Sequence, residues 1–424
     1  MNYRIIPPDG FLEARLALPL SKSMSNRAVI INALTPGAAP IAPLAECDDT
    51  RFIAEAVGRT SGEVNVGAAG AAMRFLTAYF AVREGAEVTL DGTERLRHRP
   101  VGPLVDALRS LGAQIEYLGE EGFPPLKISG RRLAGGEIEI SPSISSQFIS
   151  ALLMVAPVMT AGLRVRLSGE PVSRPYIVMT LKMMAAAGVE SEFYGYDIEV
   201  RPQTYSPLGM QVEGDWSAAA PWYQIDVMSS GSVVIENLTE RSVQGDRVLA
   251  DIFVRLGVNT DFNSEEGGTE LIPSPDQDAR LDLDFSPMPD LVPSVTVACV
   301  MLGIPFRFTG LSTLRIKECD RVQALADEMA KLGVIIEIEA ADIMRWDGAR
   351  RPVTELPRFA TYDDHRMAMA LAPVAIFIPG IVVEDVEVVS KSYPGFWDDL
   401  RSAGFVLLDG DQPFPETGEN AEES

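Results

Sequence analysis

One pattern recurs along the chain: a polar loop, an amphipathic helix, a glycine and then a strand. The glycines expected to end these helices are at positions 112, 188, 257, 333 and 404, at intervals of 76, 69, 76 and 71 residues. A sixth, degenerate copy runs from Cys47 to Val66. A unit of about 71 residues is too long for a solenoid repeat and has room for several helices and strands. The pattern therefore predicts an α/β fold with three helix-and-strand units in each half.

The charge balance limits the partners of such a chain. Its 424 residues include 36 Lys and Arg against 60 Asp and Glu, which gives a formal net charge of -24. A surface with this excess of negative charge repels nucleic acids and anionic membranes. An anionic substrate would need a local cluster of cations, which salt shields from acids more than about 10 Å away. The length allows two to three domains.

The cysteines and histidines do not form a recognisable framework. Cys47, Cys299 and Cys319 have no disulfide spacing, which favours a reducing compartment. His98 and His365 occur without a CxxC or HExxH motif, so we expect no metal site. The first residues lack the pattern of a signal peptide, and the longest apolar runs are too short to cross a membrane. These features predict a cytoplasmic protein.

Two stretches are typical of boundaries between folded units. Residues 202–213 contain prolines and lead into Gly214 and Asp215, and an alanine-rich segment follows, as expected for a crossing before a capped helix. We therefore place a domain boundary near Glu213. Residues 409–424 are acidic and almost free of apolar side chains, so we expect a disordered tail.

The stretch from Leu20 to Arg27 is the first of several places where cations meet the start of a helix. Ser21 can cap a helix that ends at Leu34, which puts Lys22 at the entrance and Arg27 about one turn inside. A cation at this end of a helix costs roughly 0.3–1 kcal/mol. A bound anion would reverse the sign, although a solvated surface would explain a single such case better.

Cations occur at further helix entrances. Gly70 belongs to a glycine loop before Arg74, and such a loop lets backbone amides approach an anion. Arg95, Arg97 and Arg99 alternate, as in an extended segment. Each case also has an ordinary explanation: tight packing at Gly70, an exposed edge strand at Arg95 to Arg99, or an internal salt-bridge lattice within residues 317–321. Taken together, the cations predict a pocket for a substrate of high negative charge. They are Lys22, Arg27, Arg74, Arg99, Lys317, Arg321, Arg366 and Lys391.

Nine short motifs follow one another along the chain. They are LSKSMSNR at 20–27, GAAMR at 70–74, LRHRP at 96–100, SSQF at 145–148, RPYI at 174–177, PD at 289–290, RIKECDR at 315–321, DHRMAM at 364–369 and Lys391. In this combination and order they resemble the 3-phosphoshikimate 1-carboxyvinyltransferase (EPSP synthase) family. The resemblance covers the chain from about residue 20 to residue 400.

The resemblance implies the enolpyruvyl transferase fold, an inside-out α/β barrel with two similar domains of three units that close on a cleft. Residues 1–20 and 214–424 would form the first, discontinuous domain, and residues 21–213 the second. The implied reaction transfers the enolpyruvyl group of phosphoenolpyruvate to the 5-hydroxyl of 3-phosphoshikimate, on the way to chorismate and aromatic amino acids. We expect no cofactor, no metal, no nucleic acid or membrane partner, and a monomer.

The resemblance also implies which residues form the site. Catalysis would depend on Lys22, Asp290 and Glu318, with Asp290 taking the hydroxyl proton and Glu318 exchanging protons at the methylene carbon. The 3-phosphoshikimate site would consist of Lys22, Ser23, Arg27, Ser145, Ser146, Gln147, Ser173, Asp290 and Lys317, with Tyr176 nearby. The phosphoenolpyruvate site would consist of Lys22, Gly70, Arg99, Gln147, Arg321, Arg366 and Lys391.

The chain departs from the family pattern at a few positions. Ala68 and Ala71 stand where the family usually has Asn and Thr, and Phe75 stands where it has Pro. The resemblance therefore does not extend to the contacts that those Asn and Thr side chains would make with phosphoenolpyruvate. Thr313 replaces an Asn of many members, which would alter one hydrogen bond to phosphoshikimate. Because the charged set is complete, we expect activity.

Two other functions stay open. The sister carboxyvinyltransferase that acts on UDP-N-acetylglucosamine has a similar fold, but the SSQ and DHRMAM motifs argue against it. A non-catalytic phosphate-binding protein would explain the cations. It would not explain Asp290 and Glu318, which repel anions and would serve only chemistry.

Overall fold

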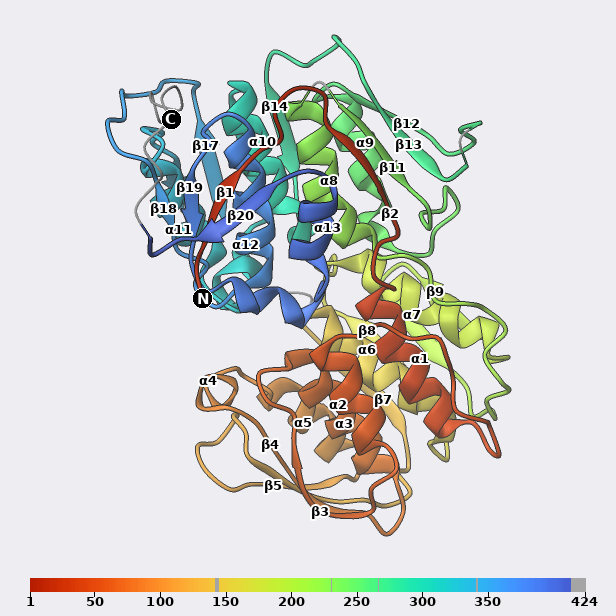
Figure 1. Cartoon of the computed structure of the whole chain (residues 1–424). Coiled ribbons are helices and arrows are strands. Elements are labelled where there is room, and N and C mark those ends of the chain that lie inside the picture. Colours follow the sequence, from red (N-terminus) through yellow and green to blue (C-terminus); the bar gives the residue numbers. More distant parts are fainter. Residues whose placement is uncertain (142–144, 230, 266, 341, 413–424) are drawn as a thin grey trace, which may run out of the picture.

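The structure is a computed structural model that describes residues 1–141, 145–229, 231–265, 267–340 and 342–412. Its buried hydrophobic side chains form two separate cores. One core draws on residues 5–18 and 216–405, and the other on residues 24–212. We call the corresponding parts the discontinuous lobe and the inserted lobe. Figure 1 shows the first strands of the chain, in red, among the green and blue elements of the discontinuous lobe.

Both lobes are built from a unit with the order β-α-β-α-β-β. In each sheet the first two strands are parallel, and the fourth strand lies between the second and the third, antiparallel to both. The described part of the chain contains five such four-stranded sheets. The predicted α/β fold with repeated helix-and-strand units is therefore confirmed.

The discontinuous lobe has three complete units. The first consists of β2 (Glu13–Leu16), α8 (Trp216–Met228), β11 (Ser232–Ile235), α9 (Leu249–Val254), β12 (Val258–Asp261) and β13 (Thr269–Pro273). The second consists of β14 (Leu281–Asp284), α10 (Val292–Leu302), β15 (Phe306–Thr309), α11 (Arg321–Ala330), β16 (Glu337–Glu339) and β17 (Ile343–Trp346). The third consists of β18 (Arg358–Phe359), α12 (His365–Leu371), β19 (Ile381–Val383), α13 (Phe396–Ser402), β20 (Val406–Asp409) and β1 (Tyr3–Ile6).

The inserted lobe has two complete units and an additional helix pair. The first unit consists of β3 (Ser61–Asn65), α3 (Gly70–Val82), β4 (Glu87–Asp91), α5 (Gly102–Ser110), β5 (Gln114–Tyr117) and β6 (Leu126–Ser129), with the short helix α4 (Glu94–Arg97) after β4. The second consists of β7 (Gly136–Ile140), α6 (Ser146–Val155), β8 (Leu163–Leu167), α7 (Arg174–Ala186), β9 (Ser191–Tyr194) and β10 (Asp197–Val200). The helix pair is α1 (Lys22–Leu34) and α2 (Asp48–Ala56).

Short 3-10 helices connect several of these elements. They are η1 (Ala156–Val158), η2 (Gly245–Val248), η3 (Pro289–Leu291), η4 (Ser312–Ile316), η5 (Ala372–Ile376) and η6 (Val386–Lys391).

The glycines that mark the repeat all follow the second helix of a unit and have positive φ angles, at residues 112, 188, 257, 333 and 404. Gly333 shows why the residue type is needed. Its φ is 73°, and a Cβ at this position would collide with the backbone carbonyl of Arg351. Only glycine adopts such a conformation without strain. The predicted end points of these helices are therefore confirmed.

The sixth copy of the repeat differs from the prediction. The strand that follows α2 is β3, and it pairs parallel to β4 at the start of the next unit. In the other copies, the strand after the second helix is the third strand of its own sheet. The pair α1 and α2 thus has no sheet of its own among the described residues. Spacing alone could not reveal this, because the partner of a strand is set by contacts that are distant in sequence.

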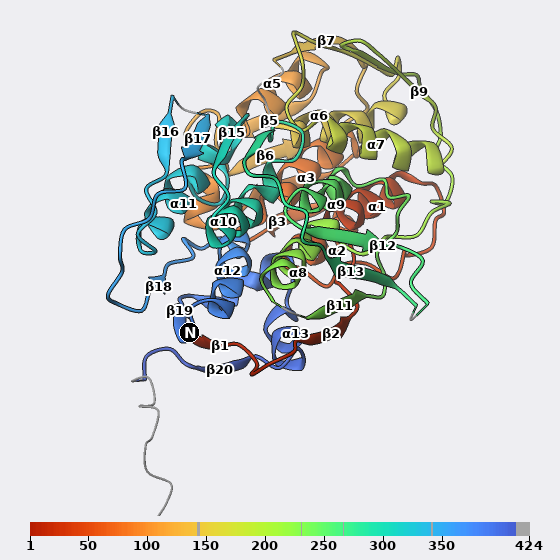
Figure 2. The ribbon, with the colours of Figure 1, turned by 90° about the horizontal axis from the view of Figure 1, so that it is seen from above.

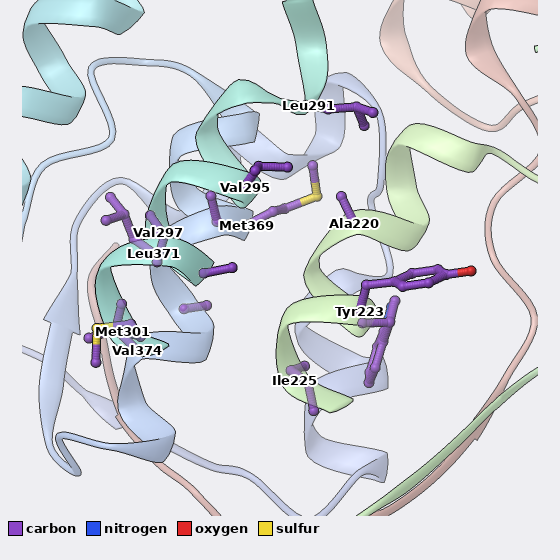
Figure 3. Close-up of a cluster of buried hydrophobic side chains, with 14 of the residues drawn as sticks. Ala220, Tyr223, Ile225, Leu291, Val295, Val297, Met301, Met369, Leu371 and Val374 are labelled. Carbon is purple, nitrogen blue, oxygen red and sulfur yellow. The ribbon is translucent and has the colours of Figure 1, made fainter. Parts of the chain in front are cut away.

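Helices form the centre of each lobe and sheets form its outside. The first helices of the three units, α8, α10 and α12, pack against one another through apolar side chains (Figure 3). Viewed from above, strands of the three sheets surround these helices (Figure 2). In α10 every residue except Leu302 is buried, as expected for a helix that is apolar on all sides. No helix in the described part of the chain is long and apolar enough to span a bilayer.

The two crossings between the lobes lie side by side. Leu20 and Gly214 form an isolated bridge, and the backbone N–H of Ser21 donates to the carbonyl of Glu213 at 2.7 Å. Asp215 caps α8 by accepting from the N–H of Ser217 at 2.9 Å, so the predicted capped helix is confirmed.

The predicted tail is folded at its beginning. Asp409 ends β20, and Asp411 accepts hydrogen bonds from Asn2 and Arg358. The strand pairing of β20 with β1 holds these residues, which composition alone did not indicate. The remainder of the predicted tail, 413–424, lies outside the described residues.

Candidate active site

A cavity of about 1040 Å³, including space open to solvent, is lined by residues of both lobes. Most of the predicted site residues line it. They are Lys22, Ser23, Arg27, Gly70, Arg99, Ser145, Ser146, Gln147, Ser173, Asp290, Lys317, Glu318, Arg321 and Arg366. Lys391 is not among the lining residues. Its ammonium donates to the backbone carbonyl of Asp363 at 2.7 Å and to its carboxylate at 2.8 Å.

Seven helices of the described part of the chain present their first turn to the cavity. The lining residues from these turns are Lys22 and Ser23 of α1, Asp49 of α2, Gly70 and Ala71 of α3, Ser146 and Gln147 of α6, Tyr176 of α7, Arg321 of α11, and His365 and Arg366 of α12. The N–H groups at the start of a helix carry partial positive charge. Their convergence therefore favours an anion in the cavity.

Local capping places these turns. Ser21 accepts from the N–H of Met24 at 3.4 Å, and Asp364 accepts from the N–H of Arg366 at 2.9 Å. The cap that the sequence predicts for α1 is thereby confirmed, and Asp364 caps α12 in the same way. Lys22 and Arg366 consequently lie at the entrances of their helices, where an anion would offset their unfavourable position.

Arg27 is buried among neutral groups. Its guanidinium donates to Thr180 Oγ1 at 2.7 Å, to the carbonyl of Ser23 at 2.8 Å and to Ser150 Oγ at 3.0 Å. It also lies over the ring of Phe75, 5.3 Å from the centroid. Burial lowers the pKa of Arg27 to about 10. A carboxylate or phosphate in the cavity would stabilise this charge.

Arg74 has a similar environment. Its guanidinium donates to Gln147 Oε1 at 2.6 Å and lies 5.2 Å from the ring centroid of Phe148. Burial, together with the charge of Arg99, lowers the pKa of Arg74 to about 9. The predicted loop before this helix thus supplies a second buried cation without a carboxylate partner among the described residues.

The segment around Arg99 is not extended as predicted. Residues 94–97 form the helix α4, and the three arginines point to different partners. Arg95 pairs with Asp363 of the other lobe at 2.7 Å, and Arg97 pairs with Asp91 at 2.5 Å. Arg99 alone reaches the cavity, where Glu318 of the other lobe lies 3.8 Å away.

Arg321 is the centre of an ion-pair network in the discontinuous lobe. Only 1% of its side chain is exposed, and it contacts Asp364 at 2.7 Å, Asp290 at 2.9 Å and Glu318 at 2.9 Å. Arg366 also pairs with Asp290, at 3.0 Å. The salt bridges that were the ordinary explanation for residues 317–321 are therefore present, and they form part of the cavity wall.

This network controls the charge of the two candidate catalytic carboxylates. Burial alone would raise the pKa of Asp290, but Arg366, Lys317 and Arg321 outweigh it and hold this pKa well below its usual range. The pKa of Glu318 also lies well below its usual range, since Arg321 and Arg99 outweigh the effect of burial. Both groups are ionised at neutral pH.

Residues 59–400 match the family model described as EPSP synthase (3-phosphoshikimate 1-carboxyvinyltransferase). A 3-phosphoshikimate 1-carboxyvinyltransferase of Bacteroides fragilis is 48% identical over 97% of this chain and 100% of its own length. One of Methanospirillum hungatei is 36% identical over 90% of this chain and 94% of its own length. The chain belongs to the EPSP synthase family.

A solved EPSP synthase structure, from Acinetobacter baumannii, has the same fold. Its TM-score is 0.76 at 20% identity, and the match covers 96% of this chain and 100% of that one. The two-domain fold that the motifs imply is thereby confirmed. Within the EPSP synthase fold, the inserted lobe carries the departures at Ala68, Ala71 and Phe75.

Phe75 lies on the cavity wall beside Arg27. It is buried, and its ring centroid lies 5.3 Å from the Arg27 guanidinium, close enough for a cation–π contact. Thr313 also lines the cavity, and its buried hydroxyl has no hydrogen-bond partner among the described residues. An unpartnered hydroxyl on a cavity wall is available to a ligand.

Sequence reasoning missed two titratable groups on the wall. Asp49 lies close to Lys22, and burial raises its pKa despite that cation. Conversely, burial by itself lowers the pKa of Lys22, but Asp49, Cys47 and Glu318 outweigh it, so the pKa lies above its ordinary value. The position of Asp49 at the start of α2, in the degenerate copy of the repeat, was the available signal.

His365 is the second missed group. It lines the cavity, and burial with the nearby Lys22 and Arg366 holds its pKa well below its ordinary value, so the ring is neutral. Neither ring nitrogen has a hydrogen-bond partner among the described residues. In the same part of the chain, no cluster of three or more His, Cys, Asp or Glu side chains has the arrangement of a metal site.

Proposed function

We propose that the protein transfers the enolpyruvyl group of phosphoenolpyruvate to the 5-hydroxyl of 3-phosphoshikimate, giving 5-enolpyruvylshikimate 3-phosphate and phosphate. Its relatives are named 3-phosphoshikimate 1-carboxyvinyltransferases, and it shares their family. One observation supports the proposal most directly: cations of both lobes line a single cavity together with ionised carboxylates. The reaction needs both, because it joins two anions and moves protons at an oxygen and a carbon.

The charge of the cavity suits these substrates. The two substrates bring roughly five to six negative charges, close to two per phosphate at neutral pH. Arg27 and Arg74 have no carboxylate partner among the described residues, so their charge is available to the substrates. We assign the 3-phosphoshikimate and phosphoenolpyruvate sites to the residues that the family resemblance implies. Lys391 would contribute least, because its ammonium must first leave Asp363.

The proton transfers follow from the same groups. As the substrate hydroxyl attacks the substituted carbon of phosphoenolpyruvate, Asp290 takes the hydroxyl proton. The methylene carbon gains a proton in this step and loses one when phosphate leaves, and we assign this exchange to Glu318 with Lys22. The cations around the cavity stabilise the charge that develops on the departing phosphate. No cofactor takes part.

The two lobes would close the cavity around the substrates during the reaction. We propose that residues 1–20 with 214–424, and residues 21–213, are two domains of a cytoplasmic monomer that close on the substrates. Contacts between the lobes support this proposal, among them Arg95 with Asp363 at 2.7 Å and Ser390 with Asp48 at 3.3 Å.

The test is an assay of phosphate release from phosphoenolpyruvate with 3-phosphoshikimate or UDP-N-acetylglucosamine as acceptor. We expect phosphate release when 3-phosphoshikimate is the acceptor and no release when UDP-N-acetylglucosamine is the acceptor. Lys22→Met should lose most of this activity. The matched control Lys182→Met, whose side chain is exposed on α7, should keep it. Release only with UDP-N-acetylglucosamine would identify the sister activity. No release with either acceptor, despite binding of 3-phosphoshikimate, would identify a phosphate-binding protein.

A further inference from the structure

A tyrosine hydroxyl joins two carboxylates at the edge of the cavity. The Tyr176 hydroxyl lies 3.3 Å from both carboxylate oxygens of Asp246 and 3.4 Å from Asp290 Oδ2. Tyr176 belongs to α7 of the inserted lobe, whereas the carboxylates belong to η2 and η3 of the discontinuous lobe. A phenol has one proton, so it can donate to only one of the two carboxylates at a time.

Close packing between the lobes fixes this arrangement. Gly245, next to Asp246, touches Pro175, next to Tyr176, and any side chain at Gly245 would overlap the proline ring. The glycine therefore lets α7 approach η2 closely enough for Tyr176 to reach Asp246. The chain of three groups forms only where the two lobes are in contact.

Asp246 has the environment of a proton acceptor. It is only 2% exposed and accepts hydrogen bonds from Tyr176 and Ser217. Burial and the charge of Asp290 raise its pKa to about 6, with Asp215 acting in the same direction and Arg366 and Ser217 opposing it. Within the described part of the chain, Tyr176 is the group that connects Asp246 most directly to the cavity by hydrogen bonds.

Asp290, in contrast, holds a proton poorly. Arg321 lies 2.9 Å from one of its oxygens and Arg366 lies 3.0 Å from the other, with Lys317 at 3.7 Å. These cations favour the ionised form, so a proton taken from a substrate would be more stable elsewhere. Asp246 holds a proton better than Asp290 does, because no cation among the described residues is in direct contact with its carboxylate.

We propose that Asp246 stores the hydroxyl proton of the reaction, which it receives from Asp290 through Tyr176. The proposal rests on the function proposed above. The O–H bond of the substrate breaks as its oxygen bonds to the enolpyruvyl carbon, and Asp290 takes the proton. Asp290 then gives a proton to the Tyr176 oxygen while the phenol proton moves to Asp246. When phosphate leaves, the same chain runs in reverse: Asp246 gives its proton to the Tyr176 oxygen while the phenol proton returns to Asp290, which passes it to the departing phosphate, so Asp246 ends ionised.

The experiment measures kcat against pH for the wild type, Asp246→Asn and Tyr176→Phe. We expect kcat to fall roughly ten- to a hundredfold in both variants, with KM for each substrate within about twofold of the wild type. The wild type should lose activity as the pH falls through about 6, where Asp246 becomes protonated, and both variants should lack this component. Substrate phosphates also titrate near pH 6 and act equally on all variants, so the difference between the profiles is the readout.

Asp226→Asn is the matched control, since it neutralises a buried carboxylate of the same lobe that does not contact Tyr176. Its pH profile of kcat should equal that of the wild type. An Asp246→Asn protein that is folded by circular dichroism and keeps both kcat and the acidic limb would overturn the proposal. If that variant does not fold, an unchanged profile in Tyr176→Phe would overturn it equally.

A second readout does not depend on turnover. Infrared difference spectra between about pH 5 and 7 should show a carboxylic acid band of Asp246 beside that of Asp226, and the Asp246 band should be lost in Asp246→Asn, kept in Asp226→Asn and shifted in Tyr176→Phe. A wild type that shows this band but releases no phosphate would contradict the proposed function and leave the hydrogen-bonded chain intact. A wild type with turnover but without the band would contradict the storage of a proton on Asp246.

Discussion

The two lobes hold their cations in opposite ways. In the discontinuous lobe, Arg321 contacts three carboxylates and Arg366 contacts one of them. In the inserted lobe, Arg27 and Arg74 are equally buried, yet their partners are hydroxyls, an amide, a carbonyl and aromatic rings. None of the ion pairs found in the described ranges involves either of these two arginines.

The difference indicates two roles for positive charge in one cavity. Cations of the discontinuous lobe keep Asp290 ionised and, together with Arg99 of the inserted lobe, keep Glu318 ionised, and the carboxylates in turn neutralise them. Arg27 and Arg74 of the inserted lobe keep their full charge for a ligand, and their lowered pKa values reflect the cost of burying that charge alone. We therefore expect substitutions in the first set to affect folding and substitutions in the second set to affect binding.

Replacement of Arg321 should have the largest effect. Arg321→Met leaves the buried Asp364 and the partly buried Asp290 and Glu318 without their shared cation, which should lower the free energy of unfolding by about 3–5 kcal/mol. The same change at Arg27 removes a charge that has no carboxylate partner. Arg27→Met should therefore alter the free energy of unfolding by less than about 1 kcal/mol. Urea unfolding of both variants measures the contrast, and equal losses would contradict the comparison.

Asp226 tests whether the effect of a buried charge on stability depends on its interaction partner rather than on the lobe that contains it. It lies in the discontinuous lobe, but neither of its carboxylate oxygens has a hydrogen-bond partner among the described residues, and burial raises its pKa to about 7. A raised pKa contributes stability below the usual carboxyl pKa of about 3.9, and this contribution is lost as the pH rises through 7. Asp226→Asn should therefore gain stability over the wild type by on the order of 2–3 kcal/mol between pH 5 and 8. The expectation would be contradicted if Asp226→Asn and the wild type differed in stability by the same amount at both ends of this pH range.

Arg27 should matter for affinity. Arg27→Met removes a cation that we assign to 3-phosphoshikimate, and charge-assisted hydrogen bonds contribute about 1.5–3 kcal/mol, so KM for that substrate should rise roughly 10- to 100-fold. Steady-state kinetics measures this change. Arg166→Met is the control, because Arg166 is exposed on β8 and pairs with Asp197 outside the cavity. A KM that stays within twofold in Arg27→Met would show that the substrate does not use this charge.

Gly70 should give the smallest effect. A Cβ at this position would lie 2.6 Å from Arg99 Nη1 and 3.0 Å from Arg74 Nη1, so Gly70→Ala must displace the ends of two flexible side chains. We expect KM for phosphoenolpyruvate to rise by up to about tenfold, or 1.4 kcal/mol, with KM for 3-phosphoshikimate nearly unchanged. Kinetics with each substrate varied in turn measures the split. An equal rise in the KM values of both substrates would place Gly70 in a part of the cavity that both substrates use.

Local features of the sequence predicted much of the fold and of the site. The caps at Ser21 and Asp215 and the glycines after the second helices depend on neighbouring residues only, and they occur where the sequence indicated. The entrance that Ser21 defines carries the predicted lining residues Lys22 and Ser23. Roles for those residues stay predictions.

Other expectations were wrong because they concerned contacts between distant segments. The strand after α2 joins the next sheet, Asp409 pairs with β1, and Asp411 is held by Asn2 and Arg358. Arg95, Arg97 and Arg99 contact different partners, because residues 94–97 form a short helix. Asp49 and Asp246 gave no strong local signal, although both are buried beside the groups that line the cavity.

The sequence by itself determined the repeated unit, the ends of its helices and the positive charges at their entrances, since each follows from a few adjacent residues. Only the tertiary structure decided which of these charges are neutralised by the protein. Asp290, Arg321 and Asp364 come from three separate segments, and Tyr176 meets Asp246 only across the two lobes. Electrostatic interactions depend on distance in space and on burial, and neither quantity can be read from positions along the chain.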